Sequence, residues 1–183
     1  MRQMPTVLFD ADRIRERIQE IGREVGESFA GQELCVVGLM KSCLVFMADL
    51  IRAIPLELSC HTVRVVQSGE SGASSRVEIV YATEVPYRGR NVLLLDDVVG
   101  TGIPLSFLIE HIREHEPKTL KVCALIDRTQ ERKIELTPDW AMFSLDESLD
   151  DRFLVGYGLE NEERYMGLPY IGTIPREGAG EES

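Results

Sequence analysis

Residues 92–104 read Val-Leu-Leu-Leu-Asp-Asp-Val-Val-Gly-Thr-Gly-Ile-Pro, and the rest of the chain can be arranged around them. An apolar run of strand length ends in two adjacent carboxylates, Asp96 and Asp97, and a Gly-Thr-Gly turn then leads into residues with helical spacing. A strand, turn and helix in this order can hold a phosphate on the backbone N–H groups at the helix start. The two acids could bind a divalent cation or the hydroxyls of a ribose. An ordinary buried strand with a polar end is the alternative, and spacing alone leaves both open.

The composition indicates a soluble globular protein. The chain has 183 residues, of which 44% are hydrophobic and 28% are charged, so we expect one domain over residues 1–175 and a disordered Gly/Glu tail over 176–183. The net charge of −11 argues against a nucleic-acid partner, because neutralising phosphates needs a basic face. No apolar run approaches the roughly 20 residues that span a bilayer. The first residues also lack the apolar core of a signal peptide, so we expect a cytoplasmic protein without a membrane partner.

Apolar periodicity predicts helices that alternate with strands. Besides the central strand, the predicted helices lie at 10–30, at 44–53 and after Gly102, and the predicted strands at 34–39, 58–66, 76–82, 120–126, 153–157 and 170–174. This order predicts an α/β fold with a mainly parallel sheet flanked by helices. Ligands of such sheets bind at the carboxyl ends of the strands, which is where Asp96 and Asp97 lie. The polar stretch at 68–75 is typical of a loop, either a lid or a plain hairpin connection.

Four blocks, taken in order, resemble the hypoxanthine(-guanine) phosphoribosyltransferases over about residues 6–174. They are Val-Gly-Leu-Met-Lys-Ser-Cys at 37–43 with 46–54, the stretch 92–102, Pro-Asp-Trp at 138–140, and Phe-Leu-Val-Gly-Tyr-Gly-Leu at 153–159 with 168–172. The resemblance implies a type I phosphoribosyltransferase fold with a small hood built from the chain ends. It also implies purine-salvage chemistry (pentosyl transfer, a glycosyltransferase reaction) on phosphoribosyl pyrophosphate (PRPP) with Mg²⁺. The expected assembly is a homodimer or homotetramer, or a pairing with an active homologue.

On the ribose and phosphate side, the resemblance assigns a role to each matching position. Asp96 and Asp97 match the acidic pair that holds the ribose hydroxyls and the metal shell. Thr101 and Gly102 match part of the loop around the 5′-phosphate. Lys41, with Ser42 beside it, matches the pyrophosphate loop.

On the purine side, Arg128 stands where a lysine reads the 6-oxo group, and Trp140 stands where the family has a stacking aromatic. Asp151 matches an acid near the purine 2-position and the second metal, so the metal set implied by the resemblance is Asp96, Asp97 and Asp151. Without the resemblance, Trp140 could be a core residue, and Asp127 with Arg128 could be a surface pair.

Several positions depart from the family pattern. Gly100 occupies the place of the aspartate that handles the purine N7 proton, and losing such a group typically costs about 10²–10⁴-fold in rate. Pro104 replaces a threonine of the phosphate loop, Met166 replaces an arginine that contacts pyrophosphate, and Ser42 replaces a glycine. The Ser-Tyr pair of the lid is absent near Gln67-Ser68.

These departures lead us to expect a protein that binds purine nucleotide and PRPP–Mg²⁺ with weak or lost transfer activity. Two alternatives stay open. The protein could be a non-catalytic regulatory or scaffold homologue, that is, a pseudoenzyme. It could also be an active purine-salvage enzyme that uses water in place of the missing base.

Overall fold

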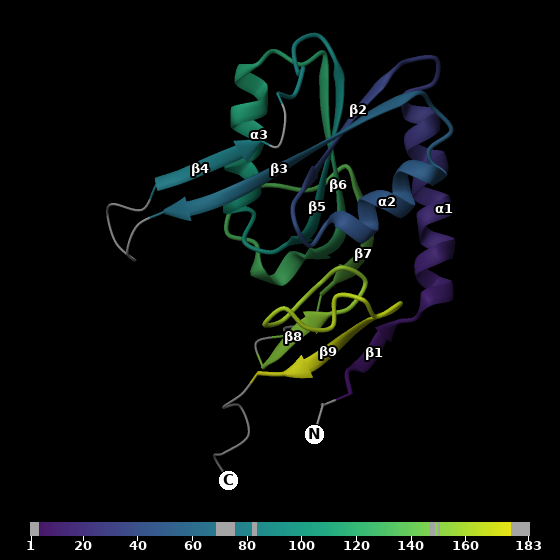
Figure 1. The fold of residues 1–183 in the computed structure, drawn as a ribbon, viewed down its shortest axis with the longest axis vertical. Coiled ribbons are helices and arrows are strands. Elements are labelled where there is room, and N and C mark those ends of the chain that lie inside the picture. The colour runs from purple at the N-terminus through teal and green to yellow at the C-terminus, as the bar shows by residue number, and fades with distance from the viewer. Residues whose placement is uncertain (1–3, 69–75, 82–83, 147–148, 150, 177–183) are drawn as a thin grey trace.

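The computed structural model describes residues 4–68, 76–81, 84–146, 149 and 151–176, and at 66–68, 76–78 and 81 it describes the backbone alone. Figure 1 shows a large sheet with helices packed on it and a small sheet below. The helices are α1 (Ala11–Ser28), α2 (Leu44–Ala53), α3 (Ile103–Glu114) and the short 3₁₀ helix η1 (Thr129–Glu131). The strands are β1 (Thr6–Phe9), β2 (Leu34–Leu39), β3 (Leu58–Ser68), β4 (Arg76–Tyr81), β5 (Asn91–Val99), β6 (Thr119–Arg128), β7 (Trp140–Leu145), β8 (Arg152–Val155) and β9 (Ile171–Pro175).

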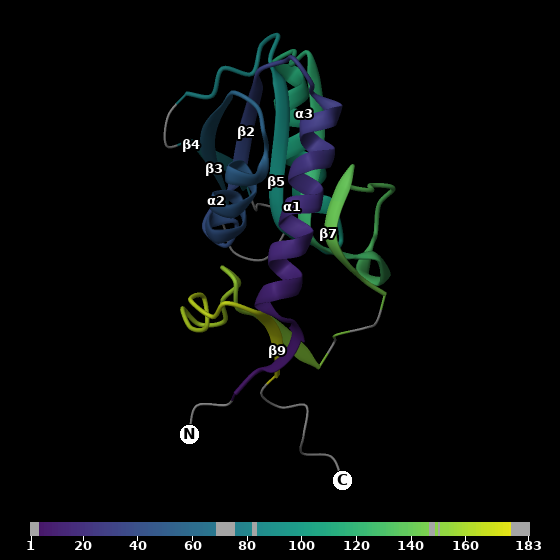
Figure 2. The ribbon, with the colours of Figure 1, turned by 90° about the vertical axis from the view of Figure 1, so that its right-hand side faces the viewer.

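The large sheet has the strand order β4-β3-β2-β5-β6-β7. All neighbours in it run parallel except β3 and β4, so the predicted mainly parallel α/β fold is confirmed. Strand β2 and residues 92–95 of β5 are apolar because both faces of the sheet are covered there. Leu93 and Leu95 pack with residues of α1 and α2, whereas Val92 and Leu94 pack with residues of α3. Figure 2 shows α1 and α3 on opposite faces of the sheet.

The small sheet has the order β1-β9-β8 and is antiparallel throughout. It joins the first described strand to the last two, as the predicted hood does. Figure 1 shows it below the large sheet. The loop after β8 reaches the carboxyl end of β2, where a Cβ atom on Gly158 would lie 2.5 Å from the carbonyl oxygen of Ser42. The hood therefore covers the edge of the sheet where a ligand site is expected.

Helix α1 follows directly from its sequence. The Asp10 side chain accepts a hydrogen bond of 2.8 Å from the Arg13 amide and caps the helix start. The apolar residues at helical spacing are buried: Ile14, Ile18, Ile21 and Val25. Helix α2 packs closely against it, since a Cβ atom on Gly22 would lie 2.6 Å from that of Ala53. The pair forms one cover over the sheet.

Two predicted segments lie largely outside the described residues: positions 69–75 of the loop and positions 177–183 of the tail. Two short strands, β1 and β7, were not predicted. Strand β6 extends to Arg128, two residues past the predicted end, because it pairs with β5 as far as Asp127 and with β7 as far as Arg128. No helix in the described part of the chain is long and apolar enough to cross a membrane.

Candidate active site

A cleft of about 290 Å³ opens between the carboxyl edge of the large sheet and the hood. Its lining includes Lys41, Ser42, Asp97, Leu154, Leu159 and Glu160. Lys41 lies in the turn after β2, and its Nζ atom is 2.7 Å from Oε1 of Glu160 in the loop after β8. The cleft thus combines a cation, two carboxylates and an apolar wall from the hood. This set of groups suits a polar ligand with an anionic part.

The acidic pair lies at the end of β5 beside this cleft. Asp96 is 5% exposed, and its Oδ1 atom accepts a hydrogen bond of 3.0 Å from the Asp97 amide. Burial raises the pKa of Asp96 well above its ordinary value, and the charge of Asp97 raises it further. Burial and the same two carboxylates also raise the pKa of the Cys43 thiol at the start of α2.

The turn after β5 leads directly into α3. Gly102 caps the helix in the left-handed region with φ 81°, which glycine adopts without strain, and no side chain caps the helix start. The Oγ1 atom of Thr101 accepts a hydrogen bond of 3.4 Å from the Ile103 amide. Pro104 lies in the first turn, as predicted, and has no N–H to donate. The turn keeps the form of a phosphate loop with one donor fewer.

The segment after β6 packs along this turn. The Lys133 amide donates to the Thr101 carbonyl at 3.1 Å, and a guanidinium nitrogen of Arg132 lies 3.5 Å from the Val99 carbonyl. A Cβ atom on Gly100 would lie 2.8 Å from Oε2 of Glu131. The segment therefore places a carboxylate beside the position where the family has its aspartate.

Arg128 stands next to this carboxylate. It forms an ion pair with Glu131, and its side chain is 11% exposed. Its Nε atom is buried and has no hydrogen-bond partner among the described residues. An oxygen atom of a bound ligand could accept a hydrogen bond from it. Asp127 is also buried and pairs instead with Arg132. The alternative of a surface pair between Asp127 and Arg128 is therefore wrong.

Trp140 is not brought to the cleft. It is the first residue of β7, in register with Cys123 of β6, and its ring centroid lies 6.5 Å from that of Phe29 after α1. Lys121 Nζ lies 4.8 Å from the ring. These contacts lie at the start of β7, whereas the cleft lies at the carboxyl ends of the strands. The structure therefore places Trp140 as a packing residue and not, as predicted, as a residue that stacks on the base.

Asp151 is not brought to the acidic pair either. Its side chain is 64% exposed, 3.9 Å from Arg152 Nε at the start of β8. Within the described ranges, no three or more His, Cys, Asp or Glu side chains gather where they could hold a metal. The predicted metal set is corrected accordingly, and Asp96 with Asp97 remains. Met166 lines a different pocket of about 510 Å³ beside Asp49 and Tyr157, so it is also outside the cleft.

Three residues with a place in or beside the site were missed from the sequence. Glu160 lines the cleft, and Glu131 faces Gly100, but each lies far along the chain from its partner. Phe153 of β8 is a 37% exposed aromatic next to the cleft-lining Leu154. Its signal was present in the sequence, because Phe153 opens one of the blocks on which the resemblance rests.

Comparison with known proteins identifies the family. The model of the phosphoribosyl transferase domain matches residues 8–162. The hypoxanthine-guanine phosphoribosyltransferase of Mycobacterium avium is 35% identical over 176 residues, covering 92% of this chain and 85% of that protein. The Bacillus subtilis protein of the same name is 34% identical over 169 residues, covering 92% of each chain. A crystal structure of a hypoxanthine-guanine phosphoribosyltransferase from Bacillus anthracis superposes with a TM-score of 0.85 at 30% identity, covering 94% of this chain and 99% of that one. With these matches along nearly its whole length, the chain belongs to the hypoxanthine-guanine phosphoribosyltransferase family.

Proposed function

We propose that this protein transfers the phosphoribosyl group of PRPP to hypoxanthine or guanine. In this reaction a ring nitrogen of the purine forms a bond to C1′ of the ribose. The bond from C1′ to pyrophosphate breaks with its electron pair on the leaving group, and the purine gives up a proton. The observation that carries the proposal is the cleft that brings Lys41, Asp97 and Glu160 together at the carboxyl edge of the sheet, beside the phosphate-loop turn.

The acidic pair supports the ribose and metal part of the proposal. Mg²⁺ is commonly held by one or two carboxylates together with substrate phosphates, and Asp96 with Asp97 fits that donor set. A bound Mg²⁺ would neutralise charge that develops on the leaving pyrophosphate. Burial, and after it the charge of Asp97, raises the pKa of Asp96, and a bound cation would favour the ionised form of this carboxyl. Lys41, 55% exposed despite its ion pair, can turn towards an anionic ligand.

Two side chains support the purine part. Arg128 offers a buried Nε donor without a partner among the described residues, and a 6-oxo group accepts such a bond. Phe153 takes the place of Trp140 as the candidate aromatic, because its side chain is 37% exposed in the hood strand that supplies Leu154 to the cleft. A planar base would stack on its ring in place of the Arg176 guanidinium, which lies 4.8 Å from the ring centroid.

One observation favours a second candidate function, which is nucleotide binding without turnover. Gly100 has no side chain for acid–base chemistry, and Pro104 removes a backbone donor from the turn. A protein with these two changes could keep its affinity for a nucleoside monophosphate and act through binding alone.

A paired experiment separates the two candidates. Formation of inosine and guanosine monophosphate is measured with PRPP, Mg²⁺ and each base, and binding of the same nucleotides is measured by calorimetry. Turnover supports the transferase. Binding without turnover supports the second candidate, and the absence of both contradicts the two together. Asp97→Asn should reduce turnover, whereas Asp12→Asn, a change of an exposed residue in the first turn of α1, should not.

A further inference from the structure

The carboxylate of Glu131 lies about as close to the Cβ position of residue 100 as the carboxylate of an aspartate at that position would. Its Oε2 atom is 2.8 Å from the point at which a Cβ atom on Gly100 would stand. The carboxyl oxygens of an aspartate lie at a similar distance from their own Cβ. In the described part of the chain, no other atom outside the neighbouring residues comes within 4 Å of that point.

The position of Glu131 is fixed by its surroundings. The ion pair with Arg128 orients one carboxylate oxygen, Oε1, and leaves the other, Oε2, facing Gly100. The backbone that follows is fastened to the same turn through the Lys133 amide and the Thr101 carbonyl, 3.1 Å apart. The Glu131 side chain is 31% exposed, so it can be reached from outside the core.

We propose that Glu131 supplies, from a neighbouring segment, the acid–base carboxylate that position 100 lacks. This inference rests on the proposed transferase function. As the purine nitrogen forms its bond to C1′ and pyrophosphate leaves with the bonding pair, the proton released by the purine passes to Oε2 of Glu131. In the reverse direction the same carboxyl group returns the proton to the base. The proton count balances in each direction without a further reactant.

In this arrangement Arg128 can both pair with Glu131 and donate a hydrogen bond to the purine. Its ion pair holds Glu131, and its buried Nε atom has no hydrogen-bond partner among the described residues. A purine that accepts a hydrogen bond from Arg128 would therefore meet the Glu131 carboxylate beside it. Glycine at position 100 leaves the space that this carboxylate needs, because any larger residue would press on it.

Steady-state kinetics of four variants test the proposal, with PRPP, Mg²⁺ and hypoxanthine. Glu131→Gln keeps the size of the side chain and a hydrogen-bond acceptor for Arg128, but removes the base. We expect kcat to fall by about 10²-fold or more with little change in KM for PRPP. The matched control is Glu135→Gln, which removes the same charge from an exposed residue of the same segment and should leave kcat unchanged.

The other two variants act on position 100. Gly100→Ala should lower kcat, because its Cβ atom would displace the Glu131 carboxylate from a distance of 2.8 Å. In the double variant Gly100→Asp/Glu131→Gln, the carboxylate returns on the other residue, and kcat should recover most of the loss. Circular dichroism checks that each variant is folded.

The outcomes separate this proposal from the function on which it rests. A fall in kcat for Glu131→Gln that Gly100→Asp reverses supports both. Turnover that Glu131→Gln leaves unchanged overturns the role of Glu131 and keeps the transferase. If the wild type binds inosine monophosphate but does not turn over, the role of Glu131 is overturned and nucleotide binding remains. If it neither binds nor turns over, both are wrong.

Discussion

Asp96 holds its proton more tightly in the folded protein than in the unfolded chain, because burial and the charge of Asp97 raise its pKa. Between the ordinary carboxyl value and this raised value, the folded state binds more protons than the unfolded state. The free energy of unfolding that this group contributes is therefore greatest in acid and is lost as the pH rises through the folded pKa. An acidic site of this kind weakens the fold in the absence of a cation.

Asp96→Asn should therefore stabilise the metal-free protein at neutral pH. Asparagine keeps the oxygen that accepts from the Asp97 amide and carries no charge. We expect a gain of about 1–3 kcal/mol at pH 7, of the size usual for relieving an uncompensated buried polar group, and a difference that vanishes below about pH 4. Urea unfolding at a series of pH values measures it. Asp12→Asn, on an 83% exposed residue, is the control, and an equal gain in both variants would contradict the assignment to burial.

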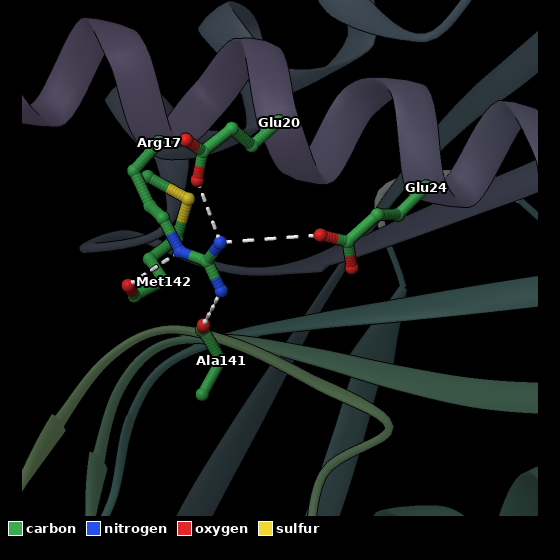
Figure 3. A network of polar contacts seen from close by, with 5 residues as sticks. All are labelled: Arg17, Glu20, Glu24, Ala141 and Met142. Atoms are coloured by element: carbon green, nitrogen blue, oxygen red, sulfur yellow. Dashed lines mark hydrogen bonds and ion pairs between the residues drawn. The ribbon is translucent and has the colours of Figure 1, made fainter.

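At the scale of elements, one arginine ties α1 to the edge strand β7. Figure 3 shows Arg17 between Glu20 and Glu24 of its own helix and the backbone of Ala141 and Met142. Its Nε and Nη2 atoms donate to the Met142 and Ala141 carbonyls at 3.0 and 3.1 Å. These bonds occupy backbone acceptors at the margin of the sheet, where unpaired groups invite association.

Arg17→Met should lower the free energy of unfolding by about 1–3 kcal/mol, because charge-assisted bonds to partly buried carbonyls are lost. Arg15→Met is the matched control. Its ion pair with Asp12 is exposed at both ends, and such pairs contribute under about 1 kcal/mol. Chemical denaturation measures the free energy of unfolding of both variants. Equal decreases in the two would mean that the contacts of Arg17 with β7 contribute nothing to stability.

The loop that closes the cleft offers a second test at this scale. Gly158 has φ 97°, and an added Cβ atom would meet the Ser42 carbonyl oxygen at 2.5 Å. Gly158→Ala should cost roughly 1–3 kcal/mol and weaken nucleotide binding, since the hood must move away from the turn after β2. Gly167→Ala in the same loop should be neutral, because none of the residues with described positions comes within 4 Å of its Cβ position. Calorimetric titration with inosine monophosphate and thermal unfolding together test the pair.

The sequence predicted those helices and strands whose pattern lies within their own residues. Helix α2 and strand β2 match their predicted bounds, because local sequence determines both. The strand is a short apolar run, and the helix ends just before Pro55. Strand β7 depends on β6 for its pairing, and β1 pairs with β9 from the other end of the chain, so no local pattern marks either one. The site divides in the same way. Asp96, Asp97 and Gly102 lie within one block, whereas Glu131 and Glu160 reach it only through the fold.

At the scale of the whole molecule, the candidate site joins two sheets that share no strand. Lys41 and Asp97 come from the large sheet, and Leu154 and Glu160 come from the hood and its loop. A ligand in the cleft would therefore add contacts between the two parts to those that they already make, such as the ion pair of Lys41 with Glu160. Because the ligand binds only the folded state, those contacts should raise the temperature of unfolding of the molecule as a whole.

PRPP with Mg²⁺ should raise the unfolding temperature more than PRPP with a chelator. At a ligand concentration of about 100 Kd the gain is about 2.7 kcal/mol, which for a chain of this size corresponds to about 5–10 °C. The part of this temperature rise that depends on Mg²⁺ should disappear in Asp97→Asn, because that variant lacks a carboxylate of the pair. Mg²⁺ without PRPP should raise the unfolding temperature of the wild type by less. Scanning calorimetry of these four conditions measures the difference. An equal rise with and without the chelator would mean that the acidic pair holds no metal when PRPP binds, and that the anionic part of the ligand is held by Lys41 and the turn before α3 alone.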